Sequence, residues 1–120
     1  MKYLLTIYGD ESGYATATPE EVGQVMAAYE AFSRAATEAG VMLGGEGLQP
    51  SGTATTVRVR NGEALTSDGP FAETREQLAG YYLLECRDLD EAIGWARRIP
   101  GAQNGAIEVR PVMDYAEVTS

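Results

Sequence analysis

Two stretches of the chain repeat apolar residues at the spacing of an amphipathic helix. In the first, apolar side chains recur every three or four residues along one face: Val22, Val25, Met26, Tyr29, Phe32 and Ala36. Thr18, Pro19 and Glu21 form a capping box with proline at the first helical position, and Gly40 is a natural stop. The pattern therefore predicts a long helix that begins at Pro19 and ends at Gly40.

The second helical stretch starts at Asp88, with Glu91 three residues later. Its apolar side is formed by Leu89, Ala92, Ile93, Ala96 and Ile99. Arg97 and Arg98 fall in its last turn, where cations favour the helix dipole, and Pro100-Gly101 ends it. We expect this helix to cover the same layer as the first, because each has a single apolar stripe.

Strand patterns fill the intervals, at residues 3–8, 41–47, 53–60, 63–67, 80–86 and 106–112. The cleanest alternation sets Val57 and Val59 opposite Arg58 and Arg60, and Asn61-Gly62 then predicts a tight hairpin turn. We assign the two valines to a core covered by the helices. One helical turn is expected near residues 74–79, where Thr74 to Gln77 resembles a small capping box.

The predicted order is strand, helix, four strands, helix, strand, which indicates an α+β fold with a ferredoxin-like antiparallel sheet. Both long helices would lie on one face of that sheet. The other face would then be uncovered, and a second copy of the chain is its simplest cover. No linker divides the chain, so we expect one domain over residues 1–120.

Composition limits the classes of partner. Nine Lys and Arg residues stand against 18 Asp and Glu, a net charge of −9, which argues against direct binding of nucleic acid. No apolar run approaches the length of a membrane span, and the first residues are not typical of a signal peptide. Cys86 has no partner for an internal disulfide, which fits a cytoplasmic protein, and we interpret it as a buried, inert thiol.

The residue types also limit the chemistry. The chain has no histidine and one cysteine, which argues against a tight zinc site and excludes Ser-His-Asp and Cys-His catalysis. A Ca²⁺ or Mg²⁺ site built from carboxylates stays open as an alternative, but no loop has the required spacing of acids, so no metal site is predicted. Glycine patterns typical of phosphate and dinucleotide binding are absent, and no cofactor is expected.

Three places carry candidate functional residues, each with a structural alternative. Asp68, in the turn Asp68-Gly69-Pro70-Phe71, is a candidate acid or base; in the alternative it accepts turn hydrogen bonds while Phe71 fills the edge of the core. Glu46 lies among glycines that let a ligand or another backbone approach, or it is exposed beside a β-bulge. Arg58 and Arg60 share one strand face and suit a small anionic ligand, or they form salt bridges with Glu46, Glu73 or Glu85.

Several separated blocks of this chain resemble the DGPF branch of the YCII-related family. These are residues 1–10, 44–50 and 54–60, followed by Asp68-Gly69-Pro70-Phe71. The resemblance implies a bacterial protein that forms a dimeric α+β barrel from two ferredoxin-like sheets packed face to face. It also implies a genomic association with extracytoplasmic-function sigma factors. A dehydrochlorinase-like branch of the family uses a His and Asp pair, and this chain has no histidine.

Two hypotheses of function follow. In the first, the protein binds or transforms a small molecule in the cavity between the sheets, with Asp68 as acid or base and Arg58 as anion anchor. In the second, the barrel is a non-catalytic regulatory or interaction module whose acidic surface meets a protein partner. The sequence names neither a substrate nor a reaction.

Overall fold

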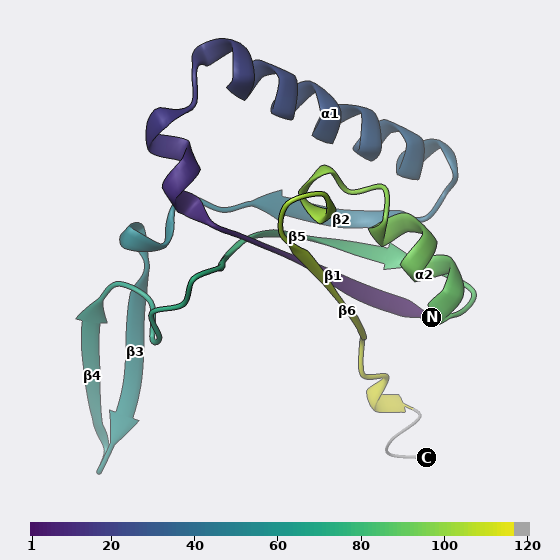
Figure 1. Ribbon diagram of the computed structural model, residues 1–120. Helices are drawn as coiled ribbons and strands as arrows, with labels where there is room; N and C mark the ends of the chain where they lie inside the picture. The colour runs from purple at the N-terminus through teal and green to yellow at the C-terminus, as the bar shows by residue number, and fades with distance from the viewer. Residues whose placement is uncertain (117–120) are drawn as a thin grey trace.

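The computed structural model describes residues 1–116 and contains six strands and two α-helices. Figure 1 shows the strands and helices in chain order from purple to yellow. Their bounds are β1 Lys2–Gly9, α1 Pro19–Glu38, β2 Met42–Gly47, β3 Thr55–Arg60, β4 Glu63–Asp68, β5 Gln77–Glu85, α2 Leu89–Ala96 and β6 Ala106–Pro111. Three short 3-10 helices occur as well: η1 Glu11–Thr16, η2 Ser51–Thr53 and η3 Pro100–Ala102.

Four strands form one antiparallel sheet in the order β2-β5-β1-β6. Both α-helices lie on the same side of this sheet (Figure 1). With β3 and β4 set aside, this is the strand order of a ferredoxin-like fold, in which the first strand lies between the last two. The predicted α+β class and the ferredoxin-like arrangement are confirmed.

The local signals for the helices are also present in the structure. The Thr18 hydroxyl accepts a hydrogen bond from the Glu21 backbone N–H at 3.1 Å, and Gly40 follows the helix with φ of 77°. Asp88 caps α2 in the same way, accepting from the Glu91 N–H at 2.9 Å. α2 ends at Ala96, so Arg97 is its C-cap and the predicted last turn is absent.

The core lies between the sheet and the helices. Alternate residues of β1 are buried there with Phe32 of α1, and Leu5, Leu84 and Ile99 are its largest fully buried side chains. Phe32 also packs on two other rings, with centroids 4.8 Å from Tyr82 and 6.1 Å from Trp95. The core therefore joins the second half of α1 to the middle of the sheet.

The opposite side of the sheet has no covering element within the described residues. We call it the open face. By strand alternation and register it presents Leu4, Thr6, Tyr8, Tyr81, Leu83 and Glu108. The expectation that one face would lack a helical cover is confirmed for the single chain.

The main difference from expectation is the hairpin of β3 and β4, which we call the arm. It pairs only with itself, as a separate two-stranded sheet, and projects from the rest of the molecule on the side away from the helices (Figure 1). Val57 and Val59 are 60% and 61% exposed, so their assignment to the helix-covered core was wrong. Alternation identifies an apolar face correctly but does not say which body covers it.

The first half of α1 departs from expectation in a similar way. Val22, Val25 and Met26 continue the stripe that buries Phe32 and Ala36, yet they are exposed, Met26 by 66%. Figure 1 shows this half of the helix extending away from the sheet. The apolar stripe is therefore longer than the surface that the chain's own sheet provides for it.

No helix among residues 1–116 is both long enough and apolar enough to cross a membrane.

Candidate functional site

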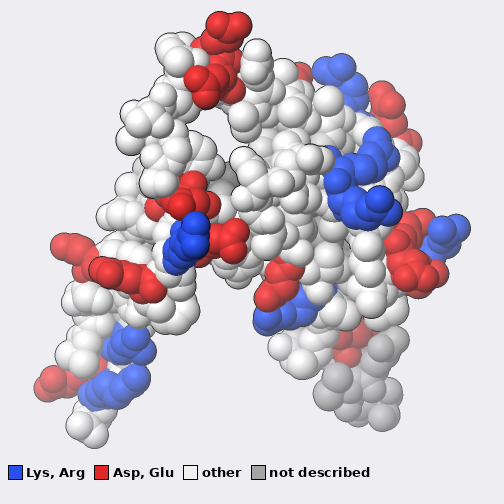
Figure 2. Space-filling model, in the orientation of Figure 1, with Lys and Arg blue, Asp and Glu red and all other residues white. Residues whose placement is uncertain are grey.

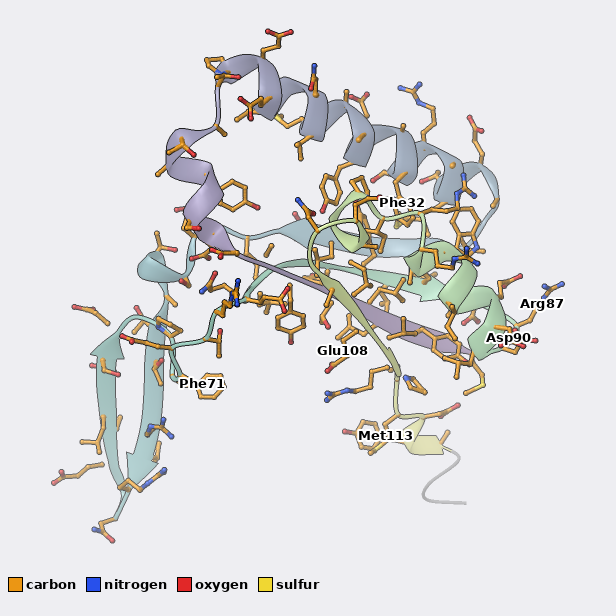
Figure 3. All side chains as sticks on the ribbon, viewed as in Figure 1. Phe32, Phe71, Arg87, Asp90, Glu108 and Met113 are labelled. Atoms are coloured by element: carbon orange, nitrogen blue, oxygen red, sulfur yellow. The ribbon has the colours of Figure 1, made fainter. Side chains whose placement is uncertain are left out.

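The Asp68-Gly69-Pro70-Phe71 turn forms the base of the arm. Gly69 has φ of 91°, a conformation that favours glycine, and its N–H donates to the Ala54 carbonyl at 2.7 Å. The Thr56 hydroxyl donates to the Gly69 carbonyl at 2.8 Å. The turn thus ends β4 and ties residues 54 and 56 to the segment that follows. Phe71 is 78% exposed at the base of the arm (Figure 3), so it does not fill the edge of the core.

A second set of bonds fixes the base of the arm to the main sheet. The Glu11 carboxylate accepts from the Ser51 N–H and the Ser51 hydroxyl, both at 2.7 Å. The Glu11 N–H donates to the Gln77 side-chain oxygen at 3.0 Å, at the start of β5. Since charge-assisted bonds of this kind are stronger than neutral ones, Glu11 is a main fastening between the two parts.

An apolar pocket of about 550 Å³ lies between these fastenings. One wall is the segment from Leu48 to Thr56, and the other runs from Pro70 to Leu78. Tyr8 of β1 closes the end nearest the sheet. Apolar atoms dominate the lining, and the polar groups at its sheet end are Thr74, Glu76 and Gln77. This combination of apolar walls and a few convergent polar groups is typical of small-molecule sites.

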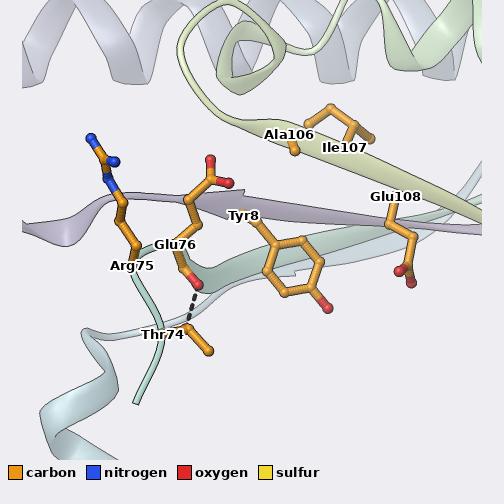
Figure 4. A pocket seen from close by; sticks show the side chains of 7 residues that line it. All are labelled: Tyr8, Thr74, Arg75, Glu76, Ala106, Ile107 and Glu108. Carbon is orange, nitrogen blue, oxygen red and sulfur yellow. Dashed lines mark hydrogen bonds between the residues drawn. The ribbon is translucent and has the colours of Figure 1, made fainter. Parts of the chain in front are cut away.

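A second, shallow pocket of about 480 Å³, wide open to solvent, adjoins the first and is lined by charged residues. The two pockets share Tyr8, Thr74 and Glu76. Arg75 and Glu108 add opposite charges to the second one, and Figure 4 shows Tyr8 and Glu108 extending to the side of the sheet away from the helices. The Thr74 hydroxyl donates to the Glu76 carbonyl, which fixes the bend between the two pockets.

A helical turn was expected near residues 74–79, and that prediction was wrong, because residues 75 and 76 form a bend and β5 begins at Gln77. Thr74 and Gln77 do interact, but through the Gln77 side-chain amide donating to the Thr74 carbonyl, and β5 begins at Gln77. Sequence reasoning thus missed Tyr8, Thr74 and Glu76 as site residues. For Thr74 and Glu76 the available signal was their position, shortly after the conspicuous Asp-Gly-Pro-Phe turn; for Tyr8 there was none.

Asp68, Arg58 and Arg60 lie on the arm, are exposed, and line neither of these pockets. Within residues 1–116 the Asp68 carboxylate and the Arg58 guanidinium form no hydrogen bond or ion pair, and Arg60 donates to the Val59 carbonyl at 2.9 Å. The salt bridges considered for the two arginines, to Glu46, Glu73 or Glu85, are therefore absent from the described chain. A single chain does not bring the three residues together with Glu46.

Glu46 lines a different hollow, of about 440 Å³, whose α1 side is formed by Tyr29 and Ser33. Its lining also includes Tyr14, Tyr29, Tyr81 and Tyr82. Burial raises the pKa of the Tyr29 phenol above its ordinary value. In the space-filling view of Figure 2 this part of the molecule is visibly hollowed beneath the helix. Glu46 itself is exposed, beside a strand with a register shift between Met42 and Gly44.

The glycines around Glu46 serve the approach of another backbone. A Cβ at Gly80 would lie 2.7 Å from the Glu46 carbonyl oxygen, and one at Gly45 would meet the Tyr82 ring at 2.6 Å. Gly45 and Gly80 therefore allow β2 and β5 to pair closely, whereas a Cβ at Gly44 or Gly47 would meet nothing within 4 Å.

Two other observations bear on chemistry. Cys86 is buried, and burial raises the pKa of its thiol, as an inert thiol requires. Among residues 1–116, no three Asp, Glu or Cys side chains gather closely enough to hold a metal ion.

Comparison with known proteins supports the architecture. The family model described as the YCII-related domain matches residues 1–116. An uncharacterized protein of Rhizobium meliloti (strain 1021) is 42% identical over 117 residues, covering 96% of this chain and 94% of the relative.

Proposed function

The chain belongs to the YCII-related domain family, and we propose that it acts as a homodimeric α+β barrel that binds or transforms a small molecule beside the open face of its sheet. One observation carries the proposal: two adjoining pockets of about 550 and 480 Å³ share Tyr8, Thr74 and Glu76. The Asp-Gly-Pro-Phe turn at their edge supports a place in the DGPF branch.

The chemistry of the lining defines the class of ligand. The larger pocket takes an apolar group between Leu48, Pro50 and Phe71, while the smaller one presents Arg75 with Glu76 and Glu108. Arg75 suits an anionic group on the ligand, and the two carboxylates suit hydroxyl or amine donors. An amphipathic small molecule with a polar end fits this pair of pockets best.

A homodimer would complete the site, because both pockets lie at the uncovered side of the sheet. Packing a second sheet on the open face removes water from Tyr8 and Glu108 and so strengthens their polar interactions. The roles assigned to Asp68 as acid or base and to Glu46, Arg58 and Arg60 in ligand binding remain hypotheses. In a dimer, the second chain would determine which groups lie next to Asp68, Arg58 and Arg60.

A thermal-shift screen of amphipathic carboxylates, phosphates and amines tests the proposal. A ligand at a hundred times its dissociation constant adds about 2.7 kcal/mol of stability. We expect Tyr8→Phe and Glu76→Gln each to weaken the shift caused by a hit. Glu38→Gln, at the exposed end of α1, is the matched control and should leave the shift unchanged. Hits that respond equally to all three substitutions would contradict this site.

The alternative is a non-catalytic regulatory or interaction module in an extracytoplasmic-function sigma factor system. The observation in its favour is the acidic surface, with 18 acidic residues against nine basic ones, which Figure 2 shows distributed over several elements. This alternative predicts no small-molecule hit and capture of a basic protein surface that weakens with salt.

A further inference from the structure

The described chain exposes more surface than a protein of its size should. Its accessible area is 8690 Å². A monomer of 12.8 kDa is expected to expose about 6,300 Å², so the excess is about 2,400 Å². Its radius of gyration is 16.7 Å, where a compact chain of this length has roughly 14 Å. Stable obligate dimers bury on the order of 1,000–2,500 Å² per chain, so the excess is the area that one such interface would cover.

Two exposed apolar strips contribute to this excess area. One is the arm face, where Val57 lies opposite Thr66 and Val59 lies opposite Ala64 in the hairpin register. The other is the first half of α1, with Val22, Val25 and Met26 exposed. A two-stranded hairpin with an uncovered apolar face is marginal in water by itself, so the arm requires a surface to pack on.

The chain cannot match these two strips to each other within one copy. The arm projects from the sheet on the side opposite the helices, as Figure 1 shows, so the sheet separates it from its own α1. Any body that covers the open face must lie alongside the arm. A second copy placed there presents its own sheet first and its own α1 behind that sheet.

The length of the arm fits this arrangement. Strands of six residues span about 20 Å at roughly 3.3 Å per residue. Packed sheets lie about 10 Å apart and a helix is about 10 Å thick, so an arm of that length passes the edge of the partner sheet and reaches its helix layer. There the first half of the partner's α1 has its uncovered stripe.

Charge does not define the partner of the arm. Its two strands carry Arg58 and Arg60 together with Glu63 and Asp68, so their net charge is zero. Figure 2 shows both signs of charge on the arm at the lower left. The two apolar strips therefore carry the inference.

We propose that the arm of each chain packs on the first half of α1 of a second copy, so that two chains exchange arms across a two-fold axis. In this dimer each arm face and each first half of α1 forms one contact, so no apolar strip is left for a third chain. Two-fold symmetry has this property. The inference rests on the homodimer of the proposed function and adds the contact that holds it.

Mixing two variants, each with one cysteine introduced in addition to the buried Cys86, tests the contact directly. Val59→Cys and Val25→Cys are prepared separately, combined under reducing, mildly denaturing conditions, refolded and oxidised. We expect a disulfide-linked heterodimer from the mixture and no linked product from Val25→Cys alone. Arg60→Cys, on the other face of the arm, replaces Val59→Cys in the matched control and should link at least tenfold less. Wild type, with Cys86 buried, should give no linked product.

Each other outcome overturns the contact. Linkage of Val59→Cys to itself means that the arms pair with one another. Equal linkage by Arg60→Cys means that the arm has no defined face on the partner. Absence of linkage in a preparation that sedimentation shows to be dimeric means that the dimer forms without the exchange.

A second variant tests the arm contact separately from the homodimer and from the proposed ligand site. Val57→Asp with Val59→Asp should shift sedimentation at micromolar concentration from dimer to monomer while circular dichroism stays unchanged, because the arm lies outside the core. A persistent dimer would overturn the arm contact and leave the homodimer standing. A wild type that is monomeric would remove both. The response of ligand hits to Glu76→Gln tests the proposed site independently of either result.

Discussion

Strands β1 and β3 each place apolar residues at alternate positions along one side, and these two sides have opposite surroundings. In β1, Tyr3, Leu5 and Ile7 are buried under the helices, whereas in β3, Val57 and Val59 are exposed. β1 is the second strand from one edge of a four-stranded sheet and has neighbours on both sides, while β3 pairs only with β4. α1 contains the same contrast within one helix, since Phe32 is buried and Met26 is exposed. An apolar side of a strand or helix must be buried against another surface. For β1 and Phe32 that surface lies in the same chain, whereas for β3 and Met26 we propose that a second chain supplies it.

The largest test of this comparison sets a core residue against an arm residue. Leu84→Ala removes a fully buried side chain and should lower the free energy of unfolding by about 2–5 kcal/mol. Val59→Ala should affect mainly the part of the stability that depends on protein concentration, because its cover comes from a second chain. Urea unfolding of both variants at two protein concentrations measures the difference. A Val59→Ala loss that is the same at both concentrations would place its cover within the chain.

The junction between the two regions gives the next largest effect. Glu11→Ala removes the acceptor of two charge-assisted bonds from Ser51 and should cost about 1–2 kcal/mol, with faster proteolysis around residues 48–56. Glu20→Ala, at an exposed site in the first turn of α1, is the control, with a change within about 0.5 kcal/mol. Urea unfolding and limited proteolysis of the pair measure both quantities. Equal behaviour of the two variants would show that the arm is held by other contacts.

The turn at the base of the arm allows a matched pair of substitutions. Gly69→Ala places a Cβ on a residue with φ of 91° and should cost about 1–2 kcal/mol. Asp68→Asn changes a carboxylate that makes no described hydrogen bond and should cost less than about 1 kcal/mol. Thermal unfolding ranks the two. If Asp68→Asn is the more damaging, the carboxylate is structural and its role as acid or base loses its basis.

The smallest effect is a pH dependence within the core. Burial raises the pKa of the Cys86 thiol above its ordinary value of 9.0, and nearby Glu91 raises it further. The unfolded thiol therefore ionises first, so stability is fully present below pH 9 and declines as the pH rises toward the folded pKa. Cys86→Ala should flatten this decline. The reaction of Cys86 with a thiol reagent at pH 8 should be slow until urea opens the core, and rapid labelling of the native protein would contradict the burial.

The sequence predicts the core better than the exposed regions. Thr18 and Asp88 cap their helices as expected, and periodicity identified the buried residues of the second half of α1. It could not separate Phe32 from Met26, because both lie on one stripe and only the extent of the sheet distinguishes them. The pockets were missed for a related reason: Tyr8 and Glu76 are far apart in the chain, and the fold of the connection brings them together.

The position of β1 in the sheet has a consequence for the order in which the protein can fold. Leu5 lies opposite Tyr82 on one side and Val109 on the other, so the first strand to be synthesised has both of its neighbours in the last third of the chain. Closing loops of that length is slow, and proteins rich in such distant pairings fold more slowly than those with local ones. On the ribosome, β1 therefore stays unpaired while the arm, whose two strands are adjacent in sequence, can already form. The least covered part of the final molecule is the part able to assemble first.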